Sequence, residues 1–589
     1  MRRAPLLFAV AGAAAVALGV AAALGRAWVC DDAFISFRYA LNLVRGDGLV
    51  FNPGERVEGY SNPLWTLLMA LGLVLGRDLE PWSVSWGVAF HAGTLGLLAW
   101  RAWSVRGAAP EWALPLPAAA LVAAAHPDWA IHATSGLETS TYTFLVLAGF
   151  VALTGPRRTF SAAAGALVAL AALTRPDGVL FAALGLAYVA VEAWLARRAR
   201  PALAVVAAFL LPWAPATLAR VLYYGSYFPN TYYAKSGSLS WWSQGLTYVG
   251  LYFERYWAVL AGFVAGALAL WVVRRVGSAV SVDGGRRRVL AGTLLAVVAS
   301  LAYGLYIARV GGDFMYARMM VPVTPLLLVA GEAGLGVLVR GATARFAVTL
   351  AAVAATVLMP PPVTGLRWVS GVADEWDYYV NVRSSWSEQG RRDGAVLRRY
   401  FDGLPIGVAF IGAEARLVYY ADPAVAVESE TGLTDAFVAR QPLLARGRVG
   451  HEKRAPAEYL LRTRRLLLAL SPAAGEKLGL DERIPYVPIA FDGFEARLLR
   501  WDPPLLEALA ARGARFPDVP ALLDGYLARR GSIPPAMLRA DYERFRAFYF
   551  DNVRDPGRDE AFRRALATAG PGTAAPTAGA GDATPAPRP

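Results

Sequence analysis

Apolar stretches separated by short polar segments make up the first 360 residues of the chain. Most of these stretches hold about twenty residues, enough for a helix to cross a hydrocarbon core about 30 Å thick. Several of the polar segments between them carry two or three arginines. The pattern predicts a polytopic α-helical membrane protein, embedded in a lipid bilayer.

The arginines indicate which segments face the cytoplasm, because cytoplasmic loops are rich in Lys and Arg. The stretch 63–76 is short for a span and is interpreted as a re-entrant or interfacial helix. Residues 28–81 then form one large external loop, and Arg101 and Arg106 lie inside. The first stretch also fits a long signal peptide, but we favour an uncleaved anchor with the N-terminus inside. About eleven spans are expected, at 5–27, 82–103, 112–127, 136–154, 160–174, 178–196, 202–222, 247–273, 289–308, 320–338 and 346–361.

The hydropathy falls after three consecutive prolines, and residues 364–566 are predicted to form an α/β domain. An odd number of spans places this domain on the extracytoplasmic side, where it is a candidate glycan-binding module. The tail 567–589 is rich in Ala, Gly and Pro, and we expect it to be disordered because it has little to bury. Within the domain the pattern predicts a helix over 374–401 and strands over 406–411 and 416–420.

The composition supports a membrane protein. Hydrophobic residues make up 56% of the chain and charged residues 17%, against about 25% charged in soluble domains. The net charge is +13, and most of it belongs to residues 1–363, which carry 27 Lys and Arg against 16 Asp and Glu. Residues 364–589 carry 31 against 29. Because the basic excess follows the predicted cytoplasmic loops and no nucleic-acid-binding motif is present, we expect no nucleic-acid partner.

Several kinds of site are excluded by the residue types. Cys30 is the single cysteine, so no disulfide can form within the chain. The four histidines are scattered, and no Cys or His cluster has the spacing of metal ligands. Neither a GxxxxGK[ST] loop nor a GxGxxG motif after a strand is present. The sequence therefore predicts no metal, no cofactor and no nucleotide-driven transport.

Two adjacent acids, Asp31 and Asp32, stand where the chain leaves the first predicted span. A carboxylate near apolar walls at the bilayer surface can act as a general base that deprotonates a hydroxyl. A nearby arginine can neutralise the phosphate of a lipid-linked substrate. The alternative is a pair of solvated interfacial residues. Further candidates in the same loop are Arg38, Glu58, Tyr60 and Asn62.

Other ionisable residues fall at the same predicted face, and such residues near membrane segments are candidates for function because their burial is expensive. Arg175 and Asp177 could instead form a structural ion pair. Residues 311–318 could be a plain turn, and Lys235 could be an interfacial cation in an aromatic belt. The group consists of Asp128, His132, Glu138, Arg175, Asp177, Lys235, Asp313 and Arg318.

Three runs in the external loop resemble AftB-like arabinofuranosyltransferases, which are GT-C enzymes of the actinobacterial cell envelope. They are DDAFISFRYA (31–40), GLVFNPGE (48–55) and VEGYSNPLW (57–65). Shorter segments follow in the same order as in that family, and the resemblance covers roughly residues 30 to 460. These are SGLET (135–139), TRPDG (174–178), PNTYYAK (229–235), GGDF (311–314), GLTD (432–435) and HEK (451–453).

The resemblance implies a GT-C fold whose first large external loop carries the catalytic carboxylate. It also implies a polyprenyl-phosphate sugar donor, decaprenyl-phosphate arabinose in AftB, and an arabinan acceptor that the C-terminal domain could hold. Asp31 and Asp32 align with the acidic pair of the family. Glu58, Arg175 and Asp313, with Arg318, lie in matching segments without an assigned role.

The resulting hypothesis is a multi-pass glycosyltransferase of the bacterial cytoplasmic membrane, which transfers a sugar, arabinofuranose by resemblance, to an envelope glycan on the outer face. A flippase for a lipid-linked glycan and a non-catalytic glycan-binding subunit are the alternatives. A single carboxylate base would invert the anomeric centre, and retention would require another role for the acid pair. The predicted catalytic residues are Asp31 and Asp32, and the predicted donor or substrate contacts are Arg38, Glu58, Tyr60, Asn62, His132, Glu138, Arg175, Asp177, Lys235, Asp313 and Arg318.

Overall fold

The computed structural model describes residues 3–155, 161–276, 284–470 and 487–568. The chain divides into two compact units, and each unit is formed by two separate stretches of the sequence. The first unit comprises residues 1–389 together with 430–453, and the second comprises 390–429 together with 454–589. The segment 430–453 therefore belongs to the unit that holds the apolar helices, although its neighbours on both sides in sequence belong to the other unit.

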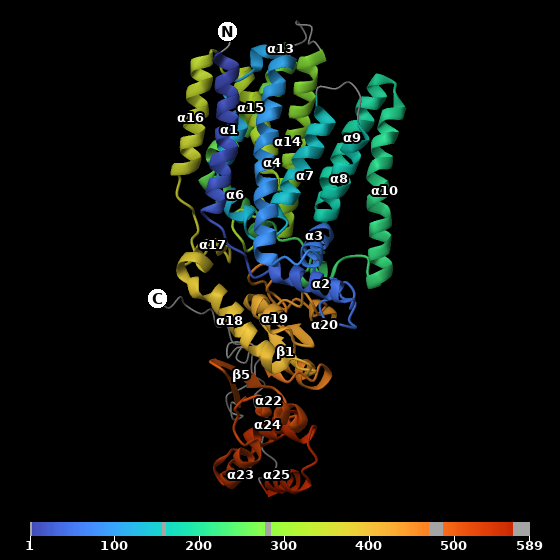
Figure 1. The fold of residues 1–589 in the computed structure, drawn as a ribbon, viewed down its shortest axis with the longest axis vertical. Coiled ribbons are helices and arrows are strands. Elements are labelled where there is room, and N and C mark those ends of the chain that lie inside the picture. The colour runs from blue at the N-terminus through green and yellow to red at the C-terminus, as the bar shows by residue number, and fades with distance from the viewer. Residues whose placement is uncertain (1–2, 156–160, 277–283, 471–486, 569–589) are drawn as a thin grey trace. The chain divides into compact units, whose positions relative to one another are not determined.

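The first unit is a bundle of apolar helices that lie side by side (Figure 1). In the described residues, five helical stretches are long and apolar enough to cross a membrane: Pro5–Leu24, Gly178–Ala196, Ala199–Tyr224, Trp257–Arg275 and Gly284–Val310. The long helices are α1 (Arg3–Leu24), α4 (Leu79–Ala108), α7 (Thr139–Thr154), α8 (Ala162–Thr174), α9 (Gly178–Ala196), α10 (Ala199–Tyr224), α13 (Trp257–Val276), α14 (Gly284–Val310), α15 (Thr324–Leu338) and α16 (Ala342–Leu358).

Short helices lie near the ends of the long ones. The short helix expected over 63–76 is present as α3. Figure 1 shows α2 and α3 at the end of the bundle opposite the start of α1. The short helices are α2 (Ala33–Arg45), α3 (Pro63–Val74), α5 (Ala118–Ala124), α6 (Pro127–Ala133), α11 (Asn230–Ala234), α12 (Trp242–Arg255), α17 (Glu375–Asp377) and α20 (Ala436–Ala439).

Two predicted spans are not single helices. The stretch 112–127 contains α5 and the first residue of α6. Pro117 and Pro127 stand at the starts of these short helices, where a proline fits because the first N–H groups of a helix have no partner within it. The stretch 247–273 is divided between α12 and α13 at Tyr256, whose backbone is not helical. Each of these two predicted spans is therefore divided into two helices in the structure.

Arginines gather at the end of the bundle where α1 begins. The guanidinium of Arg106 donates to the carbonyl of Leu114 at 2.7 Å, and that of Arg345 donates to Ala113 at 3.0 Å. Arg286 forms an ion pair with Glu111 at 2.6 Å. These contacts join the loop after α4 to the starts of α14 and α16. Arg106, Arg286 and Arg345 therefore lie close together at this end of the bundle. Two further arginines of the predicted cytoplasmic loops, Arg157 and Arg158, lie outside the described residues.

The second unit contains a five-stranded sheet in the order β2-β1-β3-β5-β4. β1 pairs in parallel with β2 and β3, and β5 pairs antiparallel with β3 and β4. The strands are β1 (Gly407–Phe410), β2 (Val425–Glu428), β3 (Leu468–Ala469), β4 (Pro488–Phe491) and β5 (Phe494–Leu498). The helices are most of α18 (Ser384–Phe401), α19 (Ala415–Ala421), α22 (Pro503–Ala511), α23 (Val519–Ala528), α24 (Pro535–Phe545) and α25 (Pro556–Thr568).

The structure confirms one of the two predicted strands in this region. The stretch 406–411 contains β1, but 416–420 lies in helix α19, so that prediction was wrong. The physical reason is topological, because two parallel strands must be joined by a crossover connection, and α19 is the helix between β1 and β2. The predicted helix over 374–401 is divided into α17, a π-helical turn and α18. Most of the predicted disordered tail, residues 569–589, lies outside the described residues.

Candidate functional site

The acid pair lies on the short link between α1 and α2. The backbone N–H of Cys30 donates to the carbonyl of Ser135 at 2.9 Å, and Asp32 is the residue before the first turn of α2. Gly136 has a positive φ of 78°, and a β-carbon there would lie 2.7 Å from Val29 and 2.9 Å from Ala33. Glycine therefore allows the turn before α7 to pack directly against Val29 and Ala33, the residues on either side of the segment that carries the acid pair.

Arg38 lies inside the loop of residues 28–81, which was predicted to be external. Its side chain is 2% exposed, and its Nε donates to the carbonyl of Phe51 at 2.8 Å. Asn42 donates to the carbonyls of Val50 and Phe51 at 3.0 and 2.9 Å. These bonds fold the loop back onto α2. Arg38 thus stabilises the loop that carries the candidate residues, and its predicted contact with a donor phosphate stays a prediction.

Several predicted residues join into one chain of hydrogen bonds, which we name the Glu138 network. Asn62 donates to Glu138 at 2.7 Å, and Glu138 forms an ion pair with Arg175 at 3.0 Å. Arg175 also binds Asp177 at 3.0 Å through Nε. The network extends to Ser36, which donates to Asn62 at 3.0 Å, and to Tyr303, which donates to Asp177 at 2.6 Å. It connects α2, α3, α7, α8, α9 and α14 and comprises Ser36, Asn62, Glu138, Arg175, Asp177 and Tyr303.

A second group lies on the loop between α14 and α15. Asp313 pairs with Arg318 and also accepts a hydrogen bond from the backbone N–H of Phe314 at 2.9 Å. Gly312 has a positive φ of 71°, and a β-carbon there would lie within 2.4 Å of the ring of Tyr248. Burial alone would raise the pKa of Asp313, but the positive charges of Arg318 and Lys235 outweigh it and hold that pKa below its ordinary value.

Phe314 brings further charged residues to this group. The guanidinium carbons of Arg318 and Arg448 lie 5.9 and 4.5 Å from the centre of its ring. Arg448 forms an ion pair with Glu375 at 2.6 Å. Burial raises the pKa of Glu375 to about 7, the positive charge of Arg448 lowers it, and the negative charge of Asp32 raises it further. We name this group the Asp32 cluster; it comprises Asp32, Lys235, Asp313, Arg318, Glu375 and Arg448.

Asp32, the second residue of the acid pair, influences the pKa values of two cations in this cluster. The charge of Asp32 helps to raise the pKa of Arg318 against the effect of burial. It likewise opposes the lowering of the Lys235 pKa, which burial causes. Asp31 and Asp32 are both partly exposed. The cluster therefore combines three cations with three carboxylates, two of them paired with Arg318 and Arg448 and the third, Asp32, partly exposed. Such an arrangement can hold a phosphate and receive a proton from a hydroxyl.

Glu375 and Arg448 were not predicted from the sequence. Arg448 lies three residues before the HEK segment at 451–453, and Glu375 lies in the stretch that was predicted as a long helix. Neither position follows a helical or strand period that would single it out. The arginines at 446 and 448, directly before a recognised segment, were the one signal that could have drawn attention to Arg448.

The remaining predicted residues make contacts of their own. Glu58 forms an ion pair with Arg220 at 2.8 Å, and burial raises its pKa to about 7 against the opposing charge of Arg220. Its backbone carbonyl accepts from the N–H of Asn230 at 2.9 Å. The other contacts join Tyr60 to Tyr224 through their hydroxyls at 3.1 Å, His132 to the carbonyl of Tyr316 at 2.9 Å, and Asp128 to Arg255 at 2.9 Å and to Tyr256.

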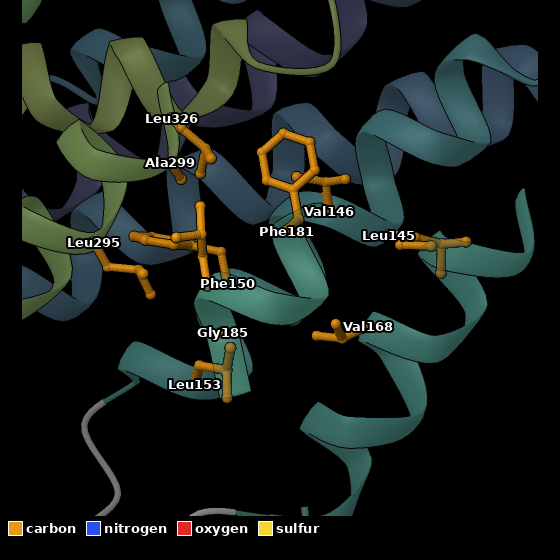
Figure 2. A pocket seen from close by; sticks show the side chains of 12 residues that line it. Leu145, Val146, Phe150, Leu153, Val168, Phe181, Gly185, Leu295, Ala299 and Leu326 are labelled. Atoms are coloured by element: carbon orange, nitrogen blue, oxygen red, sulfur yellow. The ribbon is translucent and has the colours of Figure 1, made fainter. Parts of the chain in front are cut away.

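The bundle also contains an apolar cavity of about 30 Å³, which Figure 2 shows from close by. Leu145, Phe150, Val168, Phe181 and Leu295 are among its lining residues, and they come from α7, α8, α9 and α14. A cavity of this kind offers a water no hydrogen-bond partners. We interpret it as a packing gap between helices. Among the described residues, no group of three or more His, Cys, Asp and Glu side chains has the arrangement of a metal site.

Comparison with known proteins identifies similar sequences. No family model matches the chain. The chain is 33% identical over 341 residues to the terminal beta-(1->2)-arabinofuranosyltransferase of Mycobacterium tuberculosis, covering 52% of this chain and 54% of that protein. It is 30% identical over 395 residues to the protein of the same name from Corynebacterium glutamicum, covering 60% and 56%. The resemblance stated from the sequence motifs is thus confirmed, and the chain spans little more than half the length of the curated relatives it matches.

Solved structures identify the fold. The crystal structures of ArnT from Cupriavidus metallidurans, one in the apo state and one bound to undecaprenyl phosphate, match with a TM-score of 0.51. The sequence identity is 15%, and the match covers 83% of this chain and 97% of ArnT. The chain therefore has the GT-C fold that the sequence motifs implied.

Proposed function

We propose that this chain is an integral membrane glycosyltransferase that transfers arabinofuranose from a polyprenyl-phosphate donor to an envelope glycan. The observation that carries the proposal is the Asp32 cluster, a partly exposed carboxylate beside fixed cations at one end of a GT-C bundle. The curated relatives named as arabinofuranosyltransferases support the sugar, and the undecaprenyl phosphate bound to ArnT supports a polyprenyl-linked donor.

The distribution of charge supports an extracytoplasmic site. The arginines at the other end of the bundle, among them Arg106, Arg286 and Arg345, fit the cytoplasmic side by the positive-inside rule. The loops that carry Asp32 and Arg318 then face the outer side of the cytoplasmic membrane. A donor lipid in the outer leaflet could present its phosphate and sugar to these loops while its chain stays in the bilayer.

The proposed reaction is a substitution at C1 of the sugar. The hydroxyl oxygen of the acceptor forms a bond to C1, and the bond between C1 and the phosphate oxygen breaks. The leaving polyprenyl phosphate keeps the bonding electrons and gains negative charge, which Arg318 and Lys235 stabilise. Asp32 receives the proton that the acceptor hydroxyl loses. Asp313 is the positioning residue that holds Arg318 through their ion pair.

The test is the transfer of labelled arabinose from polyprenyl-phosphate arabinose to a short arabinan oligosaccharide by the purified full chain in lipid nanodiscs. We expect transfer by the parent protein and a loss of about a hundredfold or more in Asp32→Asn, the scale of a missing general base. Asp31→Asn tests the neighbouring acid. Asp47→Asn is the matched control, because Asp47 is an exposed aspartate of the same external loop.

The outcomes separate the alternatives. Full activity in Asp32→Asn, with protein of normal thermal stability, would contradict the role given to Asp32. Absence of transfer by a parent protein that still binds polyprenyl phosphate would first exclude arabinose as the donated sugar, and donors with other sugars would follow. If none is used, movement of labelled lipid between leaflets of a proteoliposome would identify a flippase instead.

A further inference from the structure

The segment 430–453 is attached to the outer loops of the first unit. The side chain of Asn230 donates to the carbonyls of Gly432 and Leu433 at 2.9 and 2.8 Å. Gly59 lies so close that a β-carbon on it would be 2.7 Å from the carbonyl oxygen of Leu433. The segment is therefore fixed against the loop that carries Glu58 and against the loop before α11.

Three arginines of this segment lie over aromatic rings of the outer loops. Arg440 lies 4.4 Å from the ring centre of Tyr233, and Arg446 lies 4.7 Å from that of Trp241. Arg448 lies over Phe314, the ring that Arg318 also contacts. Of these three arginines, Arg448 thus shares its aromatic ring with a second guanidinium, that of Arg318 in the Asp32 cluster.

Arg448 has hydrogen-bonding capacity left over. One of its terminal nitrogens binds Glu375 at 2.6 Å. Its Nε is buried and has no hydrogen-bond partner within the described residues. A buried N–H without a partner costs free energy, and a ligand with an acceptor oxygen would satisfy it. The side chain is 26% exposed, which leaves the guanidinium accessible.

We propose that Arg448 binds the phosphate of the donor lipid, with Glu375 as the positioning residue that holds its guanidinium; this rests on the proposed function. The planar guanidinium offers parallel N–H groups that match two phosphate oxygens. Arg318 and Arg448 contact the same phenyl ring. Gly450 lies so close to Lys235 that a β-carbon added to it would be 3.4 Å from the Cε of Lys235. A phosphate in this cluster would therefore meet cations from three separate segments.

Binding measurements test the proposal without relying on sugar transfer. Purified full chain in nanodiscs is titrated with fluorescent polyprenyl phosphate and, separately, with the corresponding polyprenol, which lacks the phosphate. We expect Arg448→Gln to weaken binding of polyprenyl phosphate about 10- to 100-fold, the scale of a charge-assisted hydrogen bond. Binding of the polyprenol should stay unchanged. A loss of general packing would weaken both lipids, so the difference between them isolates the phosphate contact.

Arg446→Gln is the matched control. Arg446 lies in the same segment, stacks on an aromatic ring, pairs with Glu452 at 3.3 Å and is 28% exposed, close to the value for Arg448. This variant should bind polyprenyl phosphate within about twofold of the parent, since charge alone at an exposed site contributes little. Equal losses in Arg446→Gln and Arg448→Gln would overturn the assignment, because a diffuse charge effect would explain both.

Further variants guard against misfolding. Arg448→Lys keeps the charge but not the planar fork, and we expect an intermediate loss. The double variant Glu375→Gln with Arg448→Gln removes both charges, leaves no unpaired carboxylate, and should bind as weakly as Arg448→Gln alone. Glu375→Gln alone should weaken binding about three- to tenfold and leave polyprenol binding intact, because a neutral partner holds the guanidinium less firmly.

The source of the phosphate is tested by competition. Inorganic phosphate should displace fluorescent polyprenyl phosphate only at concentrations at least about a hundredfold higher, because it lacks the apolar chain. If inorganic phosphate displaced the lipid at similar concentrations, the site would bind a free anion, and the lipid assignment would be overturned. Parent-like binding by Arg448→Gln would refute this inference and leave the proposed function standing. Absence of any polyprenyl phosphate binding by the parent protein would refute both.

Discussion

Two groups of ionisable side chains lie in the first unit, and they differ in how fully their members are bonded. In the Glu138 network every nitrogen of the Arg175 guanidinium binds Glu138 or Asp177, and Asp177 also accepts from Tyr303. In the Asp32 cluster the side chain of Asp32 does not cap the first turn of α2, and the Nε of Arg448 has no hydrogen-bond partner among the described residues. Similar residue types therefore serve two purposes.

Under the proposed function, the difference separates a structural network from a binding site. A saturated network has no group left to offer a substrate, but it joins six helices, and any gap in it leaves a buried charge without a partner. An unsaturated cluster costs stability when it is empty and is useful when a ligand completes it. Changes in the Glu138 network should therefore lower stability most, and changes in the Asp32 cluster should lower binding or turnover most.

The largest effect on stability is expected for Arg175→Ala. The change leaves Glu138 and Asp177 buried without their cation, and a broken buried pair costs about 3–5 kcal/mol. Thermal unfolding of the purified protein in detergent should show a marked drop in the midpoint. Arg309→Ala, at an exposed arginine near the end of α14, is the control and should unfold near the parent. Equal midpoints for Arg175→Ala and the parent would remove the distinction between the two groups.

The complementary change is Arg318→Gln. We expect the affinity for polyprenyl phosphate to fall about 10- to 100-fold, the scale of a charge-assisted hydrogen bond to phosphate. The loss of stability should be smaller than for Arg175→Ala, because Asp313 keeps its hydrogen bond from the backbone of Phe314 and the nearby charge of Lys235. The measurement is lipid titration beside thermal unfolding. A variant that is strongly destabilised yet binds like the parent would place Arg318 with the structural residues.

A smaller effect is expected from pH at Glu58, which belongs to neither group. Burial raises its pKa to about 7, so between pH 4.5 and 7 the folded protein binds more protons than the unfolded chain. Stability from this residue is therefore present at low pH and is lost as the pH rises through 7. The shift corresponds to at most about 3 kcal/mol.

The measurement compares unfolding midpoints of the parent and Glu58→Gln at pH 5.5 and pH 8. The parent should gain more stability at the lower pH than the variant does, since glutamine cannot titrate. The pKa values of Asp374 and Glu375 are also raised to about 7, so these groups contribute equally to both proteins and cancel in the difference. Identical pH dependence in the two proteins would show that Glu58 keeps an ordinary pKa.

The sequence was sufficient to predict the membrane bundle and one candidate face. Asp32, Glu138, Arg175 and Asp313 each lie next to an apolar stretch, so alternating the spans brings them to one end. The sequence could not divide these residues between the Glu138 network and the Asp32 cluster, because that division depends on which side chains are in hydrogen-bonding contact. It could not place Arg448 either, since nothing in the local pattern shows that 430–453 packs with the bundle. The error at 416–420 has a related cause, because a short apolar run fits a strand or a buried helix equally well.

The smallest effect is expected at Gly450, which connects the 430–453 segment to Lys235. Its φ is +78°, so Gly450→Ala should cost about 1 kcal/mol of backbone strain. The strain should shift the segment slightly and weaken polyprenyl phosphate binding by less than about fivefold. Gly447→Ala is the control, because its nearest contact would be a carbonyl oxygen at 4.0 Å and its φ lies outside the left-handed region. Equal affinities in the two variants would mean that the segment can move without disturbing the Asp32 cluster, and Arg448 would then act through its ion pair with Glu375 alone.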